Sequence, residues 1–420
     1  MSTVLEQLRR EAEEPTHADW SSPRTATWFV PGRIEVLGKH TDYAGGRSLL
    51  AAVDRGITIN LDDNGEGISA TTSASPDVLV LHPGDRLDLP AGHWGGYLQA
   101  VVDRLALNFG ELRPARLEID SDLPLASGMS SSSALVVAMA LSLVDHNGFR
   151  ETPQWKENIT SAIDLAGYMA CFENGMTFCT LEGVRGVGTF GGSEDHTAML
   201  CCRPDQLTQF SFCPIVEHES VPFRPEWSFV VAVSGVLAEK TGTALASYNR
   251  ASQQTRDIIA AWNTATGRAD TVIADALASD EDALEGLRAV VSHSPELTAR
   301  LRAFLTESEE VIPAATRALA AGDLSEFGRL ADLSQRNADE VLGNQIPETN
   351  RLQALARELG ADGSAGFGAG FGGSVWALTR TADAEAFATD WLSRYVSEFP
   401  EVAGRATTLV TRPGGPARHL

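Results

Sequence analysis

The sequence predicts an α+β protein built of two lobes. Short strand-like runs dominate the first half, apolar residues recur at helical spacing from 307 to 359, and strand-like runs then return. Separate β-rich and helical regions are typical of α+β folds rather than of alternating βαβ units. A chain of 420 residues is long enough for two domains. We place the boundary between the lobes in the Pro-containing stretch around residues 215–228.

In the first lobe the strand-like runs are short and bounded by turn residues. The runs expected to form strands are Thr27–Val30, Leu49–Val53, Val78–Leu81 and Ala115–Ile119. The first of them is expected to end at Pro31 and to continue as a loop. The later run ALVVAMALSLV is apolar almost all round, which predicts a buried helix.

In the second lobe Asp323 is expected to cap a helix that begins at Leu324. The runs Ser374–Thr379 and Thr407–Val410 are expected to be strands. The predicted segments are an N-terminal extension, a first lobe and a second lobe, which span residues 1–23, 24–220 and 221–420.

Composition and charge limit the classes of function. The formal net charge of −23 argues against nucleic-acid and anionic membrane partners, because both attract Lys and Arg patches. No apolar run approaches the roughly 20 residues of a membrane-spanning helix, and the polar, acidic N-terminus lacks the apolar stretch of a secretory signal. The five cysteines are scattered without a C-x-x-C pair, so we expect free thiols in a reducing cytoplasm. For the oligomeric state, a monomer or a weak dimer is expected.

A glycine and serine loop precedes the buried helix: Gly128 is followed by Met129 and four successive serines, 130–133. A flexible turn that opens a helix exposes unpaired backbone N–H groups at the positive end of the helix dipole, which makes an anion site. One serine is enough for a helix cap, so the run of four favours phosphate binding. The chain contains no G-x-x-x-x-G-K-[ST] sequence, which excludes a Walker-type loop.

A second glycine loop spans residues 366–374 and contains a formal G-x-G-x-x-G match at 368, 370 and 373. The dinucleotide fingerprint follows a strand and opens a helix, whereas this loop is expected to follow a helix and to open a strand. We therefore interpret these glycines as positions where the backbone closely approaches a ligand or another loop. A simple glycine-rich turn is the alternative.

A polar motif near the N-terminus, residues 31–46, places six ionisable groups in a stretch punctuated by glycines. His40 and Asp42 are planar polar side chains of the kind that form bidentate hydrogen bonds with sugar hydroxyls. Each alone is more often a solvated loop residue, so the prediction rests on the cluster.

In this order and spacing the three motifs resemble the signatures of the GHMP kinase superfamily. The polar motif resembles the galactokinase signature G-R-x-N-x-I-G-E-H-T-D-Y-x-x-G, the serine loop resembles P-x-x-x-G-L-S-S-S-A, and the glycine loop resembles T-G-A-G-x-G-G. The resemblance covers residues 24 to 416. It implies an N-terminal lobe like the second domain of ribosomal protein S5, a C-terminal α+β lobe, and an ATP-dependent sugar 1-kinase with galactose as the first candidate substrate.

The resemblance also implies roles for individual residues. The implied catalytic pair is Asp195, within Gly192-Ser193-Glu194-Asp195-His196, and Arg33. The implied sugar-binding residues are Lys39, His40, Asp42 and Tyr248. The implied ATP-binding residues are Trp94, which the family stacks on adenine, and Gly128, Ser130, Ser131, Ser132 and Gly370. The implied Mg²⁺ ligands are Glu173 and Ser132, or its neighbour Ser131.

The implied chemistry is phosphoryl transfer, which depends on positioning and charge neutralisation more than on covalent catalysis. Asp195 is expected to accept or orient the proton of the anomeric hydroxyl. Arg33 is expected to keep that carboxylate ionised and to stabilise charge on the transferring phosphoryl group. Mg²⁺ is the expected cofactor, and a sugar and ATP are the expected partners. A purely structural ion pair between Arg33 and Asp195 is the alternative.

Several positions depart from the signatures. Lys39 stands where galactokinases have a glutamate that contacts the C6 hydroxyl. It fits either a uronic acid substrate or a lysine that pairs with Glu35, or another acid, and does not touch the sugar. The other departures are Glu35 for asparagine, His196 for glutamine, Phe367 for threonine, and extra residues within Thr177–Thr189. These leave open a related sugar 1-kinase acting on a uronic acid, arabinose or an N-acetylhexosamine, and a non-catalytic galactose and ATP sensor.

Overall fold

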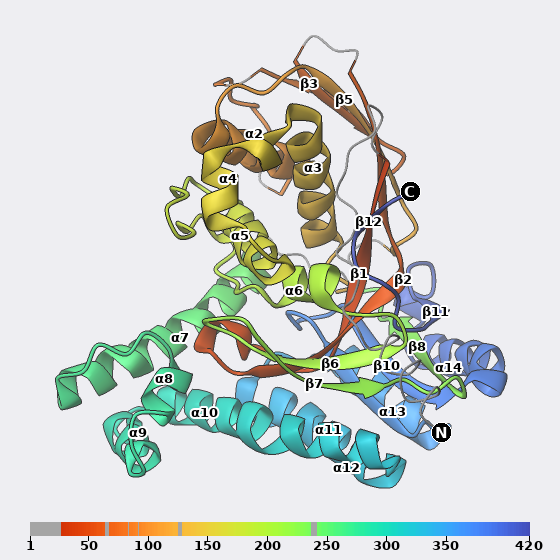
Figure 1. Ribbon diagram of the computed structural model, residues 1–420. Coiled ribbons are helices and arrows are strands. Elements are labelled where there is room, and N and C mark those ends of the chain that lie inside the picture. The colour runs from red at the N-terminus through yellow and green to blue at the C-terminus, as the bar shows by residue number, and fades with distance from the viewer. Residues whose placement is uncertain (1–26, 64–66, 83, 91, 125–127, 237–241) are drawn as a thin grey trace, which may run out of the picture.

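The computed structural model describes residues 27–63, 67–82, 84–90, 92–124, 128–236 and 242–420. These residues form two β-sheets and a mixed set of helices, so the α+β prediction is confirmed (Figure 1). The predicted extension, 1–23, lies outside the described residues, and the division at 220/221 stays a prediction. None of the described helices combines the length and apolar character needed to cross a membrane.

The larger sheet has eight strands within the described residues, in the order β12-β1-β2-β5-β3-β4, and β6 and β7 join it through β2. Its strands are β1 (Thr27–Leu37), β2 (Arg47–Asp62), β3 (Ile68–Thr72), β4 (Ser75–Leu81), β5 (Ala115–Ser121), β6 (Gln206–Ser211), β7 (Val216–Pro222) and β12 (Arg418–His419). The β3–β5 pair is parallel and the other pairs are antiparallel. Because β12 pairs with β1, the last described strand returns to the sheet that contains the first.

Helices of the first half cover one face of the larger sheet (Figure 1). They are α2 (Gly95–Phe109), α3 (Ser131–Asn147), α4 (Pro153–Asn158), α5 (Ala162–Asn174) and α6 (Glu194–Cys201). Helix α3 packs on β1 and β2, and its residues from Val136 to Asp145 are all buried. This confirms the helix expected from the run ALVVAMALSLV. It also places the serine run at the helix's N-terminal end.

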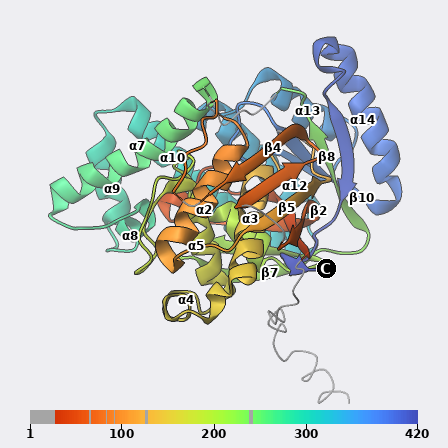
Figure 2. The ribbon, with the colours of Figure 1, turned by 90° about the horizontal axis from the view of Figure 1, so that it is seen from above.

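The smaller sheet consists of β11, β8, β10 and β9 in that order, all antiparallel. These strands span Thr407–Thr411, Trp227–Val233, Ser374–Arg380 and Gly363–Phe367, and they pack against α13 (Pro347–Glu358) and α14 (Ala384–Glu398). Trp376 of β10 donates from Nε1 to the carbonyl of Val36 in β1 at 3.0 Å. This buried bond joins the two sheets directly. Seen from above, α14 lies on the opposite side of the molecule from α9 (Figure 2).

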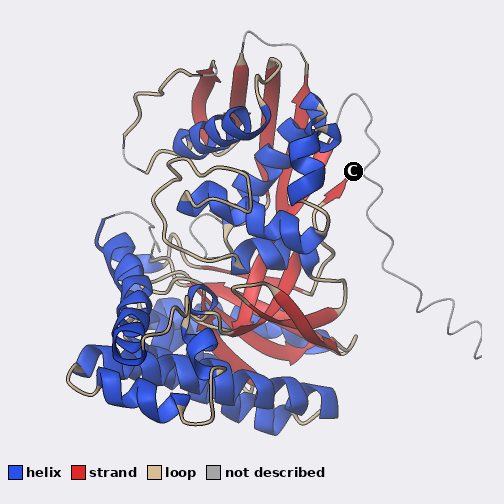
Figure 3. Ribbon diagram, turned by 60° about the vertical axis from the view of Figure 1, so that its left-hand side comes forward, coloured by secondary structure: helices blue, strands red, loops and turns tan. Residues whose placement is uncertain are grey.

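A layer of helices lies along the bottom of the molecule, beneath β6 and β7 (Figure 3). It contains α8 (Ile273–Leu277), α9 (Ala283–Val291), α10 (Pro295–Phe304), α11 (Ile312–Ala321) and α12 (Leu324–Arg336), with the π-helical turns η3 (Leu305–Val311) and η4 (Asn337–Leu342). Helix α7 (Gly242–Thr266) lies at the left of Figure 1 and packs against α8, α9 and α10. The helical prediction for 307–359 is confirmed. Asp323 caps α12 as expected, because its carboxylate accepts from the Glu326 N–H at 3.0 Å.

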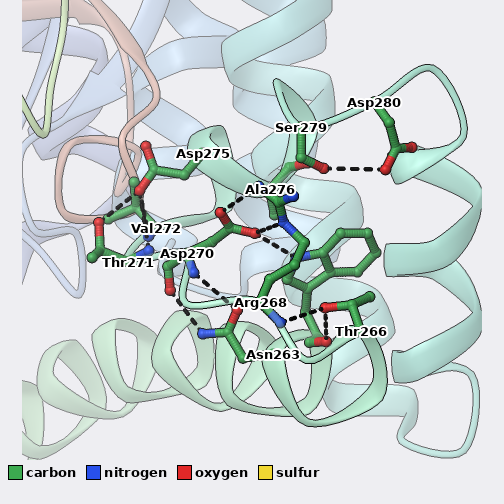
Figure 4. A network of polar contacts seen from close by, with 11 residues as sticks. Asn263, Thr266, Arg268, Asp270, Thr271, Val272, Asp275, Ala276, Ser279 and Asp280 are labelled. Atoms are coloured by element: carbon green, nitrogen blue, oxygen red, sulfur yellow. Dashed lines mark hydrogen bonds and ion pairs between the residues drawn. The ribbon is translucent and has the colours of Figure 1, made fainter.

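The turn between α7 and α8 is organised by Asp270 (Figure 4). The Asp270 carboxylate accepts from Trp262 Nε1 at 2.7 Å and from Arg268 Nε at 2.6 Å. Its backbone N–H donates to the Asn263 side chain at 3.0 Å. These contacts fix the C-terminal end of α7, the helix that carries Tyr248 near its other end.

Two expectations about local structure are wrong. The first strand does not end at Val30 but continues to Leu37, because register shifts at Pro31 and after Glu35 let the pairing with β2 resume. Such bulges accommodate a proline, which cannot donate to the ladder. The second glycine loop follows strand β9 directly and not a helix. It links β9 to β10 as a hairpin and opens no helix, so the dinucleotide fingerprint remains excluded.

Candidate active site

A cavity of about 1050 Å³ lies where the three sequence motifs meet. Its walls come from β1, the N-terminal ends of α2, α3 and α6, the end of α5, the start of α7 and the loop between β9 and β10. The predicted site residues that line it are Arg33, His40, Asp42, Trp94, Gly128, Ser130, Ser131, Ser132, Glu173, Asp195, Tyr248 and Gly370. Lys39 is the one predicted site residue outside this lining.

Arg33 and Asp195 form an ion pair at the floor of the cavity. The carboxylate Oδ1 accepts from Arg33 Nε at 2.8 Å and lies 2.7 Å from Nη2. Arg33 Nη1 donates to the Gly128 carbonyl at 2.6 Å. Burial opposes the charge on Arg33, yet Asp195, Glu194 and Glu35 outweigh it and raise the arginine's pKa. The guanidinium is therefore a permanent cation between the polar motif, the serine loop and α6.

The fourth serine of the run has a partner that the sequence did not predict. Ser133 Oγ donates to Asp195 Oδ2 at 3.3 Å, so both carboxylate oxygens of Asp195 are held. Asp195 sits in the first turn of α6, whose N-terminal dipole favours a negative charge. Arg33 and Ser133 thus fix the orientation of the carboxylate.

The N-terminal end of α3 faces the cavity without a side-chain cap. Ser130 occupies the N-cap position in the left-handed region, at φ +56°, and makes no capping hydrogen bond. Gly128 is also left-handed, and a Cβ there would lie 3.6 Å from the Phe367 carbonyl and 3.7 Å from the Ser374 nitrogen. The serine loop and the glycine loop are therefore in close contact. Uncapped N–H groups at this point suit an anionic ligand.

His40, Tyr43 and Tyr248 form an aromatic cluster on the other side of the cavity. His40 Nδ1 accepts from the Tyr43 hydroxyl at 2.7 Å, and Nε2 donates to the Ala369 carbonyl at 3.0 Å. The Tyr248 ring centroid lies 5.0 Å from that of His40. Burial, partly opposed by the bond to Ala369, lowers the pKa of His40 to about 4, so the imidazole is neutral at neutral pH. His40 thus ties the polar motif to the glycine loop.

Asp42 is buried against the loop that leads into α6. Its Oδ2 accepts from the Glu194 N–H at 3.3 Å. A Cβ at Gly192 would lie only 2.4 Å from the same oxygen, so a larger residue there would displace the Asp42 carboxylate. Burial raises the pKa of Asp42, with backbone hydrogen bonds from Tyr43, Glu194 and Gly192 acting in the opposite direction. Asp42 therefore presents a desolvated carboxyl group to the cavity near Asp195.

Glu35 and Glu194 are two buried carboxyl groups in the wall of the cavity. Glu194 Oε2 accepts from Ser48 Oγ at 2.6 Å, and Glu35 Oε2 accepts from the Gly368 N–H at 3.2 Å. Burial raises the pKa of Glu35 to about 7, although Lys39 and Arg33 oppose the shift. Burial and the neighbouring carboxylates, Glu35 first, also raise the pKa of Glu194. Two carboxyl groups in one buried site disfavour simultaneous ionisation.

Replacing Glu35 with glutamine is expected to make folding stability less dependent on pH. The raised pKa means that the folded state favours protonated Glu35, so wild-type stability falls as pH rises from about 4.5 towards 7. Glutamine stays neutral and keeps the acceptor for the Gly368 N–H. Above neutral pH, urea unfolding should therefore give the variant a free energy of unfolding up to about 3 kcal/mol higher than that of wild type. Near pH 5 this difference should be absent. Parallel stability profiles would contradict this.

Lys39 points away from the cavity. Its Nζ donates to Ser334 Oγ at 2.9 Å, and that hydroxyl donates to Glu307 Oε1 at 2.8 Å. Glu307 also accepts from the Gly38 N–H at 3.0 Å, and Lys39 itself is only 4 % exposed. The buried lysine thus has acidic neighbours in Glu307 and Glu35. This geometry favours the reading in which Lys39 does not touch the sugar, and its role in substrate binding stays a prediction.

Candidate cation ligands come from the serine loop and from α5. Glu173 and Ser132 both line the cavity, and carboxylate and hydroxyl oxygens are donors that suit Mg²⁺. Across the described residues no group of three or more His, Cys, Asp or Glu side chains could hold an ion. The residues therefore fit a cation that shares its coordination with bound phosphate. The cavity lining also includes residues that the sequence did not single out. Among them are Arg185, Gly186 and Thr189, from the segment Thr177–Thr189 that contains the extra residues.

Comparison with known proteins identifies the family of this arrangement. Residues 96–176 match the family "GHMP kinases N terminal domain", and residues 315–397 match "GHMP kinases C terminal". Residues 18–61, which contain the polar motif, match "Galactokinase galactose-binding signature".

Full-length relatives and solved structures agree with these matches. The galactokinase of Roseiflexus sp. (strain RS-1) is 28% identical over 388 residues, covering 90% of this chain and 89% of that protein. The galactokinase of Thermotoga neapolitana is 23% identical over 373 residues, covering 88% and 94%. The structure of Lactococcus lactis galactokinase complexed with galactose shares the fold, with a TM-score of 0.74, 21% identity and coverage of 100% and 99%. The L. major mevalonate kinase structure is more distant, with a TM-score of 0.58, 14% identity and coverage of 96% and 99%. The chain belongs to the GHMP kinase family, as a phosphotransferase that carries the galactokinase galactose-binding signature.

Proposed function

We propose that this chain is an ATP-dependent sugar 1-kinase that converts α-D-galactose and ATP to galactose 1-phosphate and ADP. The observation that carries the proposal is the position of Asp195. Its carboxylate lies between the cluster of His40, Asp42 and Tyr248 and the uncapped end of α3, and both of its oxygens are held. One carboxylate thus borders the part of the cavity that suits a sugar and the part that suits phosphate.

In the proposed reaction the anomeric hydroxyl attacks the γ-phosphorus of ATP. Its oxygen forms the new P–O bond, the bond to the ADP oxygen breaks, and Asp195 accepts or orients the departing hydroxyl proton. Arg33 holds Asp195 ready for that role and places a cation close to the negative charge of the transferring group. The fixed ion pair needs no reorganisation during the step.

The serine loop and the glycine loop are proposed to bind the phosphates. The free N–H groups at the start of α3 and the hydroxyls of Ser130, Ser131 and Ser132 offer donors, and Gly370 lines the cavity from the glycine loop. When bound, Mg²⁺ would neutralise phosphate charge. Glu173 and Ser132, or Ser131, are proposed to hold it. Neutralisation of the phosphate charge is important because four acidic residues also line the cavity, namely Glu35, Asp42, Glu194 and Asp195.

We also propose that the protein acts in the cytoplasm, as a monomer or weak dimer. All five cysteines of the chain fall in its described part and each is free. Free thiols, among them the buried Cys171 and Cys202, are typical of a reducing compartment.

A coupled ADP-release assay over galactose, galacturonate, arabinose and N-acetylgalactosamine tests the proposal. We expect turnover with galactose to exceed that with the other sugars. A preference for galacturonate would favour the uronic acid alternative, for which the buried contact of Lys39 with Ser334 offers no support. Tight galactose binding without ADP release would favour a sensor, but the intact Arg33–Asp195 pair and the serine loop argue for turnover.

Replacing Trp94 with alanine is expected to raise the KM for ATP about tenfold with little change in kcat, since stacking of a base on an aromatic ring contributes about 1–3 kcal/mol. Trp94 lines the cavity, and its Nε1 has no hydrogen-bond partner among the described residues. Steady-state kinetics of Trp94→Ala and of Trp94→Phe, which keeps an aromatic face, would check this. An unchanged KM for ATP in the alanine variant would show that Trp94 is a packing residue.

A further inference from the structure

His196 is a buried histidine of the cavity wall that the proposed mechanism does not use. It follows Asp195 in the first turn of α6 and is only 2 % exposed. Neither ring nitrogen has a hydrogen-bond partner among the described residues. Buried polar groups are nearly always hydrogen-bonded, so an imidazole in this state points to a ligand that completes its surroundings.

Glu173 is the nearest acidic group to the His196 ring. His196 Nε2 lies 3.4 Å from Glu173 Oε1, and both residues line the cavity. This separation is longer than the usual N–H···O hydrogen bond of about 2.9 Å. It is close to the distance between two donors of one ion, because donors about 2.1 Å from a metal at adjacent positions lie roughly 3.0–3.4 Å apart.

We infer that His196 is a direct ligand of the divalent cation that accompanies ATP, alongside Glu173. The inference rests on the proposed function, because the described residues supply too few ligands without the phosphates. Helices α5 and α6 pack against each other and bring the two side chains to the same wall. The protein then offers one imidazole nitrogen, one carboxylate oxygen and one serine hydroxyl. The phosphate oxygens complete the coordination.

A nitrogen ligand changes which metals the site prefers. Imidazole suits later transition metals such as Co²⁺, whereas Mg²⁺ prefers oxygen donors only. His196→Gln, which replaces the ring with an amide, is expected to weaken Co²⁺ binding in the presence of ADP by about tenfold. The affinity for Mg²⁺ with ADP should change far less. The Co²⁺ to Mg²⁺ preference, measured by titration calorimetry, should therefore fall in the variant.

Pulsed electron paramagnetic resonance with Mn²⁺ and ADP tests the bond directly. The full-length protein should show the ¹⁴N coupling of a coordinated imidazole, and His196→Gln should lose it. His218→Gln is the matched control, because His218 is an exposed histidine of β7 that bonds Ser211 and does not line the cavity. It should keep the coupling. If His196→Gln does not fold, His196→Asn takes its place.

The outcomes separate the inference from the function on which it rests. Bound Mn²⁺ and ADP without nitrogen coupling in the wild-type protein would overturn the metal ligand and leave the kinase intact. Coupling that persists in His196→Gln would also overturn it. Failure of the wild-type protein to bind Mn²⁺ with ADP would remove the proposed function, and the inference with it.

Discussion

Replacing Asp195 with asparagine is expected to lower kcat by about three orders of magnitude, the range associated with losing a proton acceptor and a fixed charge in an active site. Asparagine has nearly the same shape and can still accept from Arg33 through its amide oxygen. It cannot take the hydroxyl proton, and it leaves the positive charge of Arg33 unbalanced. The loss should therefore fall on kcat, with a smaller effect on the KM values for sugar and ATP.

A chemically equivalent change elsewhere controls for loss of structure. Asp145 is buried, pairs with Arg150 at 2.5 Å and accepts from Trp28 Nε1 at 3.0 Å, but it does not line the cavity. Asp145→Asn also removes a carboxylate from an arginine and should keep its turnover number. Steady-state ADP release from both variants, checked by circular dichroism, measures the difference. Near-normal turnover in Asp195→Asn would show that the Arg33–Asp195 pair has a structural role and not a catalytic one.

Local sequence patterns predicted the elements that depend on local physics. The apolar run after the serines predicted the buried helix α3, and Asp323 predicted the cap of α12. The motif residues themselves were identifiable because clustered glycines, serines and ionisable groups have few structural reasons to occur together. The resemblance to the family, and not local clustering, added Trp94, Glu173, Asp195 and Tyr248. Twelve of the predicted site residues fall around one cavity, with Lys39 outside it.

What the sequence could not predict depends on contacts between distant segments. Arg300 donates to the His40 carbonyl at 2.5 Å across 260 positions, and Lys39 bonds Ser334 across 295. No local pattern specifies such pairings. The bulge at Pro31 is a similar case, because the register shift that keeps Arg33 on a strand is set by pairing with β2. Ser133 is different: it belonged to a recognised run, and only its distance to Asp195 shows what the fourth serine does.

Replacing Arg33 with methionine is expected to abolish most activity and to destabilise the fold by about 3–5 kcal/mol, the usual result of removing one partner from a buried ion pair. The guanidinium binds Asp195 and the Gly128 carbonyl, and it lowers the cost of burying Glu35 and Glu194. Methionine fills a similar volume without charge. The carboxyl groups around it then lose the cation that favours their ionised forms.

The sign of the pH dependence distinguishes this account from simple loss of packing. As pH rises, more carboxyl groups of the cluster must ionise without a cation, so the stability deficit of Arg33→Met should grow between about pH 5 and pH 8. Arg104→Met is the matched control, because Arg104 is fully buried but bonds Asn108 and the Met176 carbonyl. Its deficit should stay nearly constant across that range. Urea unfolding at both pH values measures the two deficits.

Arg33→Lys separates charge from geometry in the same experiment. Lysine keeps the cation, so most of the pH-dependent deficit should disappear, but a single ammonium cannot reproduce the planar fork that reaches both Asp195 and Gly128. Stability should therefore recover more than kcat does. Equal deficits for Arg33→Met at both pH values, or full recovery of kcat in Arg33→Lys, would contradict the account. In either case, the orientation of Asp195 would have to come from another contact, such as the hydrogen bond that Ser133 donates through Oγ.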